Sequence, residues 1–251
     1  MAIAPFLAMT AAEIRGNSTL PPGLAWMACH FSPYGLGLSN LPRELPPGAL
    51  LMVDDITPIH GHDPQRILDQ LAECAEALSC SGILLDFQRP DIGETAALVD
   101  VLTQGLPCPV AVSHFYAGPG TFPVFLPPVP PSVPPEEHLS PWQGRELWLE
   151  LALDAVEITV TEDGTSFQSL PAALPAEPEF FEEALLCRYH CDVEENTVRF
   201  TLRRAPEDLE QLLSKAEAFG VTRAVGLYQE FHRHGSAQSL PCAKGGGTAK
   251  P

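Results

Sequence analysis

Basic residues are scarce in this chain. Its 251 residues include only 14 Lys and Arg against 32 Asp and Glu, which gives a formal net charge of -18. So acidic a surface repels the phosphates of nucleic acids and the anionic surface of membranes, and we expect neither as a partner. Long apolar runs are also lacking, because no stretch reaches the roughly 18 residues that a membrane span requires.

Several catalytic and targeting motifs are absent as well. No glycine-rich phosphate loop follows the first strand-like run, where residues 31–34 read Phe-Ser-Pro-Tyr, and this disfavours a dinucleotide-binding protein. The sequence has no Gly-x-Ser-x-Gly nucleophile elbow. No Lys or Arg precedes the apolar residues 1–10. We therefore interpret this segment as part of the fold or a loose arm, not as a secretory signal.

The seven cysteines form no Cys-x-x-Cys pair. Cys187 and Cys191 lie on either side of His190, a spacing that a metal site can also use. Buried thiols of a protein in a reducing compartment explain the set more simply. We therefore expect a cytoplasmic protein.

Proline is abundant, with 27 residues, about twice its usual frequency. The prolines cluster in loops, as at residues 127–135, because proline lacks an amide donor and fixes φ. Between the loops lie short apolar runs that mostly lack strict alternation, which is typical of parallel strands covered on both faces. Eight such runs are predicted as strands: 24–31, 49–55, 82–87, 109–113, 123–126, 146–152, 197–202 and 224–228.

Helices are predicted between several of these strands. Asp63 followed by Pro64 is a helix start, and the helix runs to about residue 78. Others are predicted at about 94–104 and from Ala205 to Gly220. The alternation predicts an α/β fold, a (β/α)8 TIM-like barrel with some short or missing helices, and an open doubly wound sheet is the alternative.

Two segments interrupt the alternation of strands and helices. The stretches 156–168 and 185–202 are expected to form added β-hairpins, the first around an Asp-Gly turn. We expect a single barrel domain over residues 1–234, and a disordered tail at 235–251 because that segment is rich in Gly, Ser and Ala without periodicity.

In such a barrel, functional groups gather at the carboxyl ends of the strands. Those ends are rich in carboxylates, amides and aromatic rings, which is the side-chain set of a carbohydrate site. The residues expected to bind substrate are His30, Tyr34, Asp55, Phe87, Arg89, His114, Tyr116, Glu150 and Tyr228. An alternative is a metal-dependent hydrolase, because potential ligands also cluster in one short segment. These are Asp54, Asp55, His60 and His62.

The third strand and its exit, residues 81–90, read Ser-Gly-Ile-Leu-Leu-Asp-Phe-Gln-Arg-Pro. This segment resembles the signature strand of glycoside hydrolase family 18, the chitinase-like barrels, whose pattern is Asp-Gly-x-Asp-x-Asp-x-Glu. Its matching residues are Gly82, Asp86, Phe87 and Pro90. Ser81 and Leu84 replace the first two aspartates of the pattern, and Gln88 stands in the position of the catalytic glutamate.

The resemblance implies a substrate-assisted mechanism, in which the acetamido oxygen of the sugar attacks and a glutamate protonates the leaving oxygen. Asp86 would orient the acetamido group, but Gln88 has no proton to give, and loss of a general acid alone removes roughly 10²–10⁴-fold in rate. We therefore expect the chain to bind a small saccharide, an N-acetylhexosamine-type glycan or peptidoglycan fragment, without family-typical hydrolysis. No cofactor and no metal are expected at this site.

Other functions stay open. An active glycoside hydrolase would need a relocated acid, and Glu230 and Glu150 are the candidates, so that Asp86, Gln88 and Glu230 are the positions considered for catalysis. A structural or partner-binding barrel, which uses the acidic surface and the proline-rich loop, is a further alternative.

Overall fold

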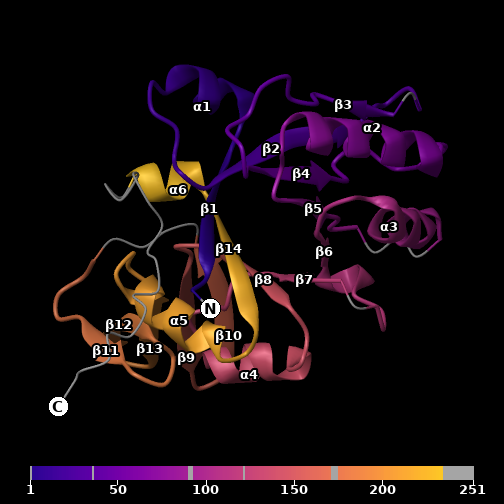
Figure 1. Cartoon of the computed structure of the whole chain (residues 1–251). Coiled ribbons are helices and arrows are strands. Elements are labelled where there is room, and N and C mark those ends of the chain that lie inside the picture. Colours follow the sequence, from indigo (N-terminus) through magenta and orange to yellow (C-terminus); the bar gives the residue numbers. More distant parts are fainter. Residues whose placement is uncertain (1, 36, 90–92, 121, 171–174, 234–251) are drawn as a thin grey trace, which may run out of the picture.

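The computed structural model describes residues 2–233 apart from 36, 90–92, 121 and 171–174 (Figure 1). Eight parallel strands pair in a ring, which β1 closes by pairing with both β14 and β2. A short strand β3 (Leu38–Ser39) adds antiparallel to β2. The eight barrel strands are β1 (Ala4–Met9), β2 (Leu24–Phe31), β4 (Leu50–Asp54), β5 (Gly82–Asp86), β6 (Val110–Ser113), β7 (Val124–Leu126), β8 (Leu147–Leu151) and β14 (Val221–Leu227).

Helices of unequal length connect these strands, as the sequence predicts for a TIM-like barrel. The longest is α2 (Pro64–Ala77), which Asp63 caps by accepting a hydrogen bond from the Gln65 N–H. After β6 the chain forms only a short 3-10 turn before β7. The remaining helices are α1 (Ala11–Gly16), α3 (Glu94–Gly105), η1 (His114–Tyr116), α4 (Pro135–Leu139), η2 (Ser140–Trp142), α5 (Asp208–Glu217) and α6 (Tyr228–Arg233).

The barrel interior is filled by inward-pointing side chains from all eight barrel strands. Trp148 on β8 is fully buried there, among Phe6, Leu84 and Phe125. The guanidinium of Arg223 stacks over the Trp148 ring at 4.3 Å from its centroid. Because side chains fill the interior, we expect the functional groups at the carboxyl ends of the barrel strands.

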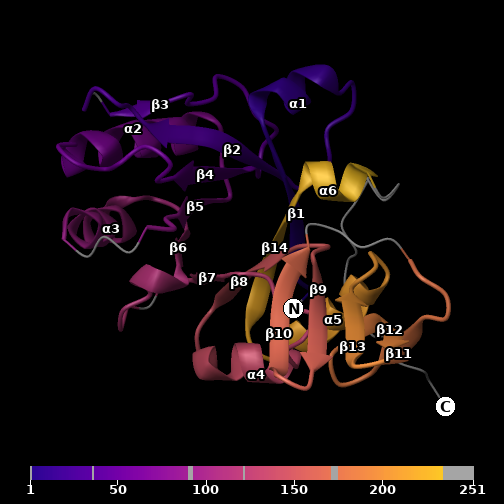
Figure 2. The same cartoon turned by 180° about the vertical axis from the view of Figure 1, so that it is seen from behind.

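A five-stranded antiparallel sheet is inserted between β8 and α5 and lies toward the viewer in Figure 2. Its order is β10-β9-β13-β12-β11. The two hairpins expected from the sequence are β9–β10 and β12–β13. The strands of this sheet are β9 (Ala155–Thr161), β10 (Gly164–Leu170), β11 (Phe180–Glu182), β12 (Cys187–Glu194) and β13 (Thr197–Arg203).

One strand assignment is wrong. Residues 197–202, counted among the eight barrel strands, form β13 of the inserted sheet, and the missing barrel strand is β1 at Ala4–Met9. The apolar start of the chain is thus part of the fold. The expected tail at 235–251 lies outside the described residues. Within the part that the structure describes, no helix combines the length and apolarity required to cross a membrane.

Two arginines, one buried and one half-buried, donate hydrogen bonds to the backbone carbonyls of irregular loops. Arg204 is 4% exposed and donates to the carbonyls of Val129, Pro130, Leu185 and Leu186. Arg145 likewise donates to four carbonyls between residues 117 and 122. These carbonyl groups are therefore hydrogen-bonded although they lie outside helices and strands.

Candidate functional site

Three neighbouring strands bring a polar row to the carboxyl end of the barrel. His30 on β2 pairs in register with Asp54 on β4, which pairs in register with Asp86 on β5. Asp54 and Asp86 each follow an inward-pointing residue by two positions, so their side chains also face the barrel axis. His30 Nδ1 and Asp54 Oδ2 are 2.6 Å apart, a short charge-assisted contact.

Asp86 is bound by the side chain two residues further on. Gln88 Nε2 donates a hydrogen bond to Asp86 Oδ1. Burial raises the pKa of the Asp86 carboxyl, the Gln88 hydrogen bond opposes this, and the neighbouring Asp54 and Asp55 raise it further. The amide of Gln88 therefore occupies one oxygen of a carboxylate that its other neighbours make costly to ionise.

Glu150 adds a second carboxyl to the mouth of the barrel. It follows the inward-pointing Trp148 by two positions on β8, three strands away from β5 in the ring. Burial, Asp86, Glu230 and Asp154, in that order, raise the pKa of Glu150 to about 7. Glu150 is therefore half protonated near neutral pH, and it can donate a hydrogen bond or a proton there.

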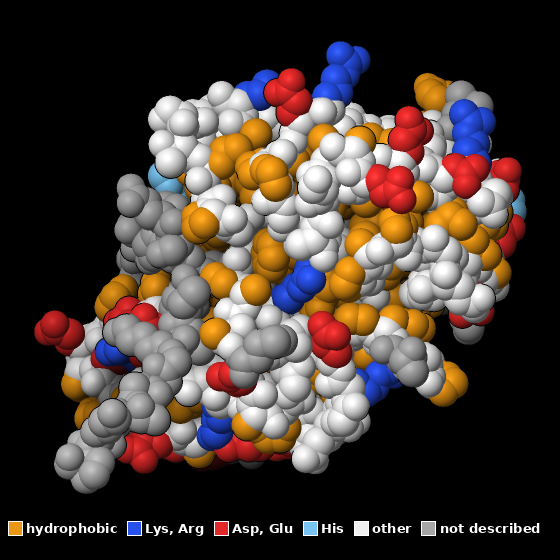
Figure 3. Space-filling view, viewed as in Figure 1, with side chains coloured by type: hydrophobic (Ala, Val, Ile, Leu, Met, Phe, Trp, Pro, Cys, Tyr) orange, Lys and Arg blue, Asp and Glu red, His pale blue; other side chains and the backbone are white. Residues whose placement is uncertain are grey.

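Glu230, at the start of α6, lies beside this group. Its Oε2 accepts a hydrogen bond of 3.2 Å from the Leu153 backbone N–H, which fixes the carboxyl at the exit of β8. Burial raises the pKa of Asp154, the other carboxyl at that exit. The mouth of the barrel is thus lined with carboxylates, and acidic side chains are also scattered over the face of the molecule in Figure 3.

Asp55 has a different position from that expected for a ligand-binding residue. It is 5% exposed, and its two oxygens accept hydrogen bonds from the backbone N–H groups of Gln88 (3.0 Å) and Arg89 (2.8 Å). The Arg89 guanidinium in turn donates to the Ile56 carbonyl. Asp55 therefore holds the loop that carries Gln88.

Two of the expected binding residues contribute their rings to the protein core. Phe87 is fully buried against the helices outside the barrel, with its ring centroid 5.8 Å from that of Phe31. Tyr228 is 8% exposed, and its hydroxyl donates to Asn17 Oδ1 at 2.8 Å. Neither ring lines the mouth of the barrel in this structure.

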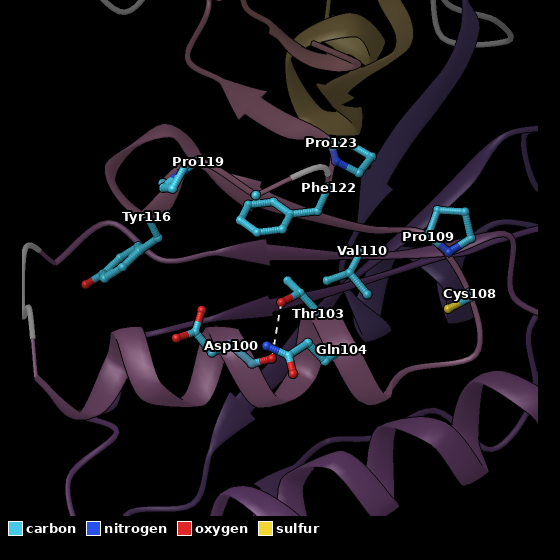
Figure 4. Close-up of a pocket in the computed structure, with 12 residues that line it drawn as sticks. Asp100, Thr103, Gln104, Cys108, Pro109, Val110, Tyr116, Pro119, Phe122 and Pro123 are labelled. Carbon is cyan, nitrogen blue, oxygen red and sulfur yellow. Dashed lines mark hydrogen bonds between the residues drawn. The ribbon is translucent and has the colours of Figure 1, made fainter.

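Three more expected residues lie around the rim or outside it. Tyr34 is 82% exposed in the loop after β2. His114 is half-buried in η1 with a pKa lowered by burial and by His138. Tyr116 donates its hydroxyl to the Arg89 carbonyl and lines a groove of about 610 Å³ between α3 and the loop after β6 (Figure 4). Of these three residues, only Tyr34 offers a freely exposed ring.

The described residues do not support the alternative of a metal-dependent hydrolase. Asp54 pairs with His30, and His60 pairs with the exposed Glu94 at 3.1 Å. His62 packs edge-on against the Phe31 ring with a centroid separation of 5.3 Å. Among the residues that the structure describes, no three His, Cys, Asp or Glu side chains are grouped to hold a metal ion, and this includes the Cys187–His190–Cys191 segment.

The pairing of Asp54 with His30 was not predicted from the sequence, which places both only near the ends of apolar strands. The register that aligns them depends on a bulge in β2 between Trp26 and Cys29. That bulge turns His30 inward, and no local pattern in the sequence predicts it.

No protein-family model matches the chain, and no curated protein matches it either. Solved structures do match. The spore cortex-lytic enzyme SleL of Bacillus cereus aligns with a TM-score of 0.57 and 10% identity, over 97% of this chain and 76% of that one. A chitinase of Chromobacterium violaceum aligns with a TM-score of 0.56 and 10% identity, over 94% of this chain and 99% of that one.

A third match is a family 18 chitinase of Cycas revoluta, in a variant with one Gly-to-Trp and one Glu-to-Gln change and in complex with (GlcNAc)4. It aligns with a TM-score of 0.52 and 12% identity, over 89% of this chain and 94% of that one. At these identities the likeness concerns the fold. The chain therefore has a TIM-like (β/α)8 barrel, a fold that it shares with these enzymes, with an added antiparallel sheet.

Proposed function

We propose that the chain binds a saccharide at the carboxyl end of its barrel, an N-acetylhexosamine-type glycan or peptidoglycan fragment, without family-typical hydrolysis. The observation that carries the proposal is the Asp86–Gln88 pair at the exit of β5. Its carboxylate can accept the N–H of an acetamido group, and its amide can both donate to and accept from sugar oxygens. The Gln88 amide, at the position of the glutamate in the resembling pattern, has no proton to give.

The row of polar groups supports a hydroxyl-rich ligand. His30, Asp54 and Asp86 lie in register on three neighbouring strands, and Glu150 on β8 is close enough for Asp86 to raise its pKa. A ligand lying across the mouth of the barrel can therefore meet several acceptors at once. The exposed ring of Tyr34 lies in the loop directly after β2, where a sugar ring can stack on it. The Cycas chitinase, which shares this fold, is in complex with (GlcNAc)4 in one structure and with (GlcNAc)3 in another, and this supports a GlcNAc oligomer as the ligand to test.

We further propose that binding takes place in the cytoplasm. The six described cysteines are all free thiols, as expected in a reducing compartment. A saccharide imported by the cell, or one released inside it, suits this location better than an insoluble polymer does.

The test is a titration with (GlcNAc)2 to (GlcNAc)4 and with muropeptides, followed by calorimetry and by thermal unfolding. Because such a ligand binds only the folded state, a hundredfold excess over Kd should raise stability by about 2.7 kcal/mol. Asp86→Ala should abolish the shift. Asp100→Asn on the exposed side of α3 is the matched control and should bind as the wild type does.

A shift of equal size in wild type and Asp86→Ala would overturn the assignment of the site, and the absence of any shift would overturn saccharide binding. Incubation of each oligomer with the wild type should leave its length unchanged by mass spectrometry. Shortened oligomers would contradict the claim that family-typical hydrolysis is lost.

One observation favours a second candidate, hydrolysis with Glu150 as the acid. Its pKa of about 7 suits a general acid at neutral pH, whereas Glu230 is already bonded to the Leu153 N–H. If oligomers are cleaved, Glu150→Gln should reduce the rate at least a hundredfold and Glu230→Gln much less. Equal loss in both variants would contradict this assignment.

A further inference from the structure

Histidines contact carboxylates at several places in the chain, and one such pair lies in the mouth of the barrel. His30 Nδ1 is 2.6 Å from Asp54 Oδ2, and the two side chains are 30% and 19% exposed. The contact between His60 and Glu94 is longer, at 3.1 Å, and these side chains are 86% and 54% exposed. The His30–Asp54 pair is therefore the shorter and the better sheltered of the two.

Asp54 is held in a way that orients the imidazole. Its Oδ1 accepts a hydrogen bond of 3.1 Å from the Ile56 backbone N–H, and its Oδ2 binds His30 Nδ1. Both oxygens of the carboxylate thus have a donor within the protein. Because a carboxylate only accepts, the contact places a proton on Nδ1, and Nε2 of the neutral imidazole then carries a free lone pair.

The Nε2 atom of His30 is open to a ligand. No described residue donates to this atom or accepts from it. It is not enclosed either, because in the described part of the chain the one buried side-chain nitrogen or oxygen without a partner is His62 Nδ1. Cys29 and Phe31, on either side of His30, pack into the cluster outside the barrel, so the imidazole between them points toward the barrel axis.

The candidate saccharide site lies beside this nitrogen. His30 is in register with Asp54 on the neighbouring strand, and Asp54 is in register with Asp86 on the next. Because neighbouring strands lie about 4.8 Å apart, His30 is roughly 10 Å from Asp86 along the mouth. A sugar bound at the Asp86–Gln88 pair can therefore reach His30 with a substituent of its ring.

We propose that the His30–Asp54 pair acts as a general base that hydrolyses an O-acyl ester, such as an O-acetyl group, on the bound saccharide. This inference rests on the saccharide binding proposed above. His30 is the catalytic residue, because its Nε2 takes a proton from the attacking water. Asp54 is a positioning residue, because it fixes the orientation and the protonated nitrogen of the imidazole.

The reaction balances with water as the only co-reactant. His30 Nε2 removes a proton from water while the water oxygen forms a bond to the acyl carbon. The bond between that carbon and the sugar oxygen then breaks, and the imidazolium returns its proton to the sugar oxygen. The products are a carboxylic acid and a sugar hydroxyl. Gln88 has a second side-chain N–H besides the one that binds Asp86, and this donor can stabilise the negative oxygen of the tetrahedral intermediate.

An ester suits these groups better than the other bonds of an acylated sugar. Cleavage of a glycosidic bond requires an acid that protonates the leaving oxygen, and the Gln88 amide has no proton to give. Hydrolysis of an acetamido group has to expel an amine, which is a poorer leaving group than a sugar hydroxyl. An ester requires only that water be activated by a base, and the free Nε2 of His30 supplies this base.

Release of acetate from mono-O-acetylated (GlcNAc)2, followed by NMR, tests the proposal. The wild type should release acetate, and His30→Ala should lower kcat by roughly a hundredfold or more. Asp54→Asn, which keeps the size of the side chain, should lower kcat by roughly tenfold or more with little change in KM. His60→Ala removes the histidine of the exposed pair and is the matched control, which should retain wild-type activity.

Added imidazole separates a chemical role of His30 from a structural one. It should restore part of the activity of His30→Ala, because a free base can enter the vacated space. It should restore less when His30→Ala is combined with Asp54→Asn, because the carboxylate that orients the base is then missing. Circular dichroism and the melting temperature show whether each variant folds.

Acetate release that His30→Ala leaves unchanged would overturn the proposal, and so would a wild type that releases no acetate. Calorimetry with unacetylated (GlcNAc)2 to (GlcNAc)4 separates this failure from that of the proposed function. Binding of the oligomers without acetate release would overturn the esterase inference alone. Absence of both binding and acetate release would overturn the saccharide site as well.

Discussion

The carboxylate of Asp55 accepts a hydrogen bond of 3.0 Å from the backbone N–H of Gln88. This contact joins the end of β4 to the loop after β5, and the other Asp55 oxygen binds the next N–H, that of Arg89. The position of the Gln88 side chain therefore depends on a buried group on the neighbouring strand. Asp55 thus fixes the backbone of Gln88, and Asp86 binds its side chain.

Asp55→Ala should destabilise the protein and weaken saccharide binding together. The partly buried backbone N–H groups of Gln88 and Arg89 would lose their acceptor, at a cost of about 1–3 kcal/mol in the free energy of unfolding. Urea denaturation measures the first effect and calorimetric titration the second. Asp55→Asn, which keeps one acceptor oxygen, should fall between wild type and Asp55→Ala. Unchanged affinity in a destabilised Asp55→Ala variant would contradict the role of Asp55 in placing Gln88.

Gln88→Glu should give the protein a hydrolytic activity. The new carboxyl would stand two residues after Asp86 and, being next to that buried carboxylate, would retain its proton more readily. A general acid contributes roughly 10²–10⁴-fold in rate, so cleavage of a chromogenic chitobioside should rise by at least a hundredfold over the wild type. Gln88→Met, similar in size but without an acid, is the control. Retained binding without turnover in Gln88→Glu would show that more than the proton donor is lacking.

Glu150→Gln should change how stability depends on pH. In the unfolded chain Glu150 titrates near its ordinary pKa of 4.5, and in the folded chain near about 7. Between these values the folded state binds more protons, so wild-type stability falls as pH rises through this interval and this contribution is constant above it. Relative to wild type, the variant should gain on the order of 3 kcal/mol between pH 4 and pH 8.

Urea unfolding at intervals from pH 4 to pH 8 measures this difference. Glu162→Gln in the exposed turn between β9 and β10 is the matched control and should follow the wild-type curve. Parallel curves for wild type and Glu150→Gln would show that Glu150 ionises as an ordinary glutamate does.

Gly82→Ala should destabilise the barrel although β5 is a regular strand. A Cβ at this position would lie 2.9 Å from the Pro109 carbonyl oxygen and 2.9 Å from the Trp148 ring. Such overpacking costs typically about 1–3 kcal/mol. Thermal unfolding measures the loss, and Trp148→Phe in the same chain should recover part of it by making room. No recovery in the double variant would mean that the Pro109 carbonyl or the Arg223 guanidinium, 2.8 Å from the added Cβ, causes the clash.

The barrel could be predicted because parallel strands buried on both faces leave a plain mark in the sequence. Runs such as Leu50–Asp54 and Gly82–Asp86 are short, continuous and bounded by turn residues. β1 was not predicted as a strand because Ala and Pro occupy its start. One of its two partners, β14, also lies near the other end of the chain, so no neighbouring segment indicates the pairing. β13 was misassigned although Val198, Phe200 and Leu202 alternate with polar residues, the mark of an antiparallel sheet with one wet face.

At the candidate site, the direction of the carboxylate side chains could be predicted from the sequence better than that of the aromatic side chains. Asp86 and Glu150 lie two residues after buried strand positions, so the two-residue period of a strand already aims both inward. By the same period, Phe87 next to Asp86 points outward into the helix layer. The Tyr228 hydroxyl binds Asn17, which is far away in the sequence. No local sequence pattern predicts such a contact.

The inserted sheet begins and ends at one place. Ala155, its first residue, pairs directly with Arg203, its last. The polypeptide therefore leaves the barrel and returns to it through a single point of attachment, and a short turn joining these two residues would close the chain with little change in the path of β8 or α5. Recombination can therefore lengthen, exchange or remove the inserted sheet without changing the fold of the eight-stranded barrel.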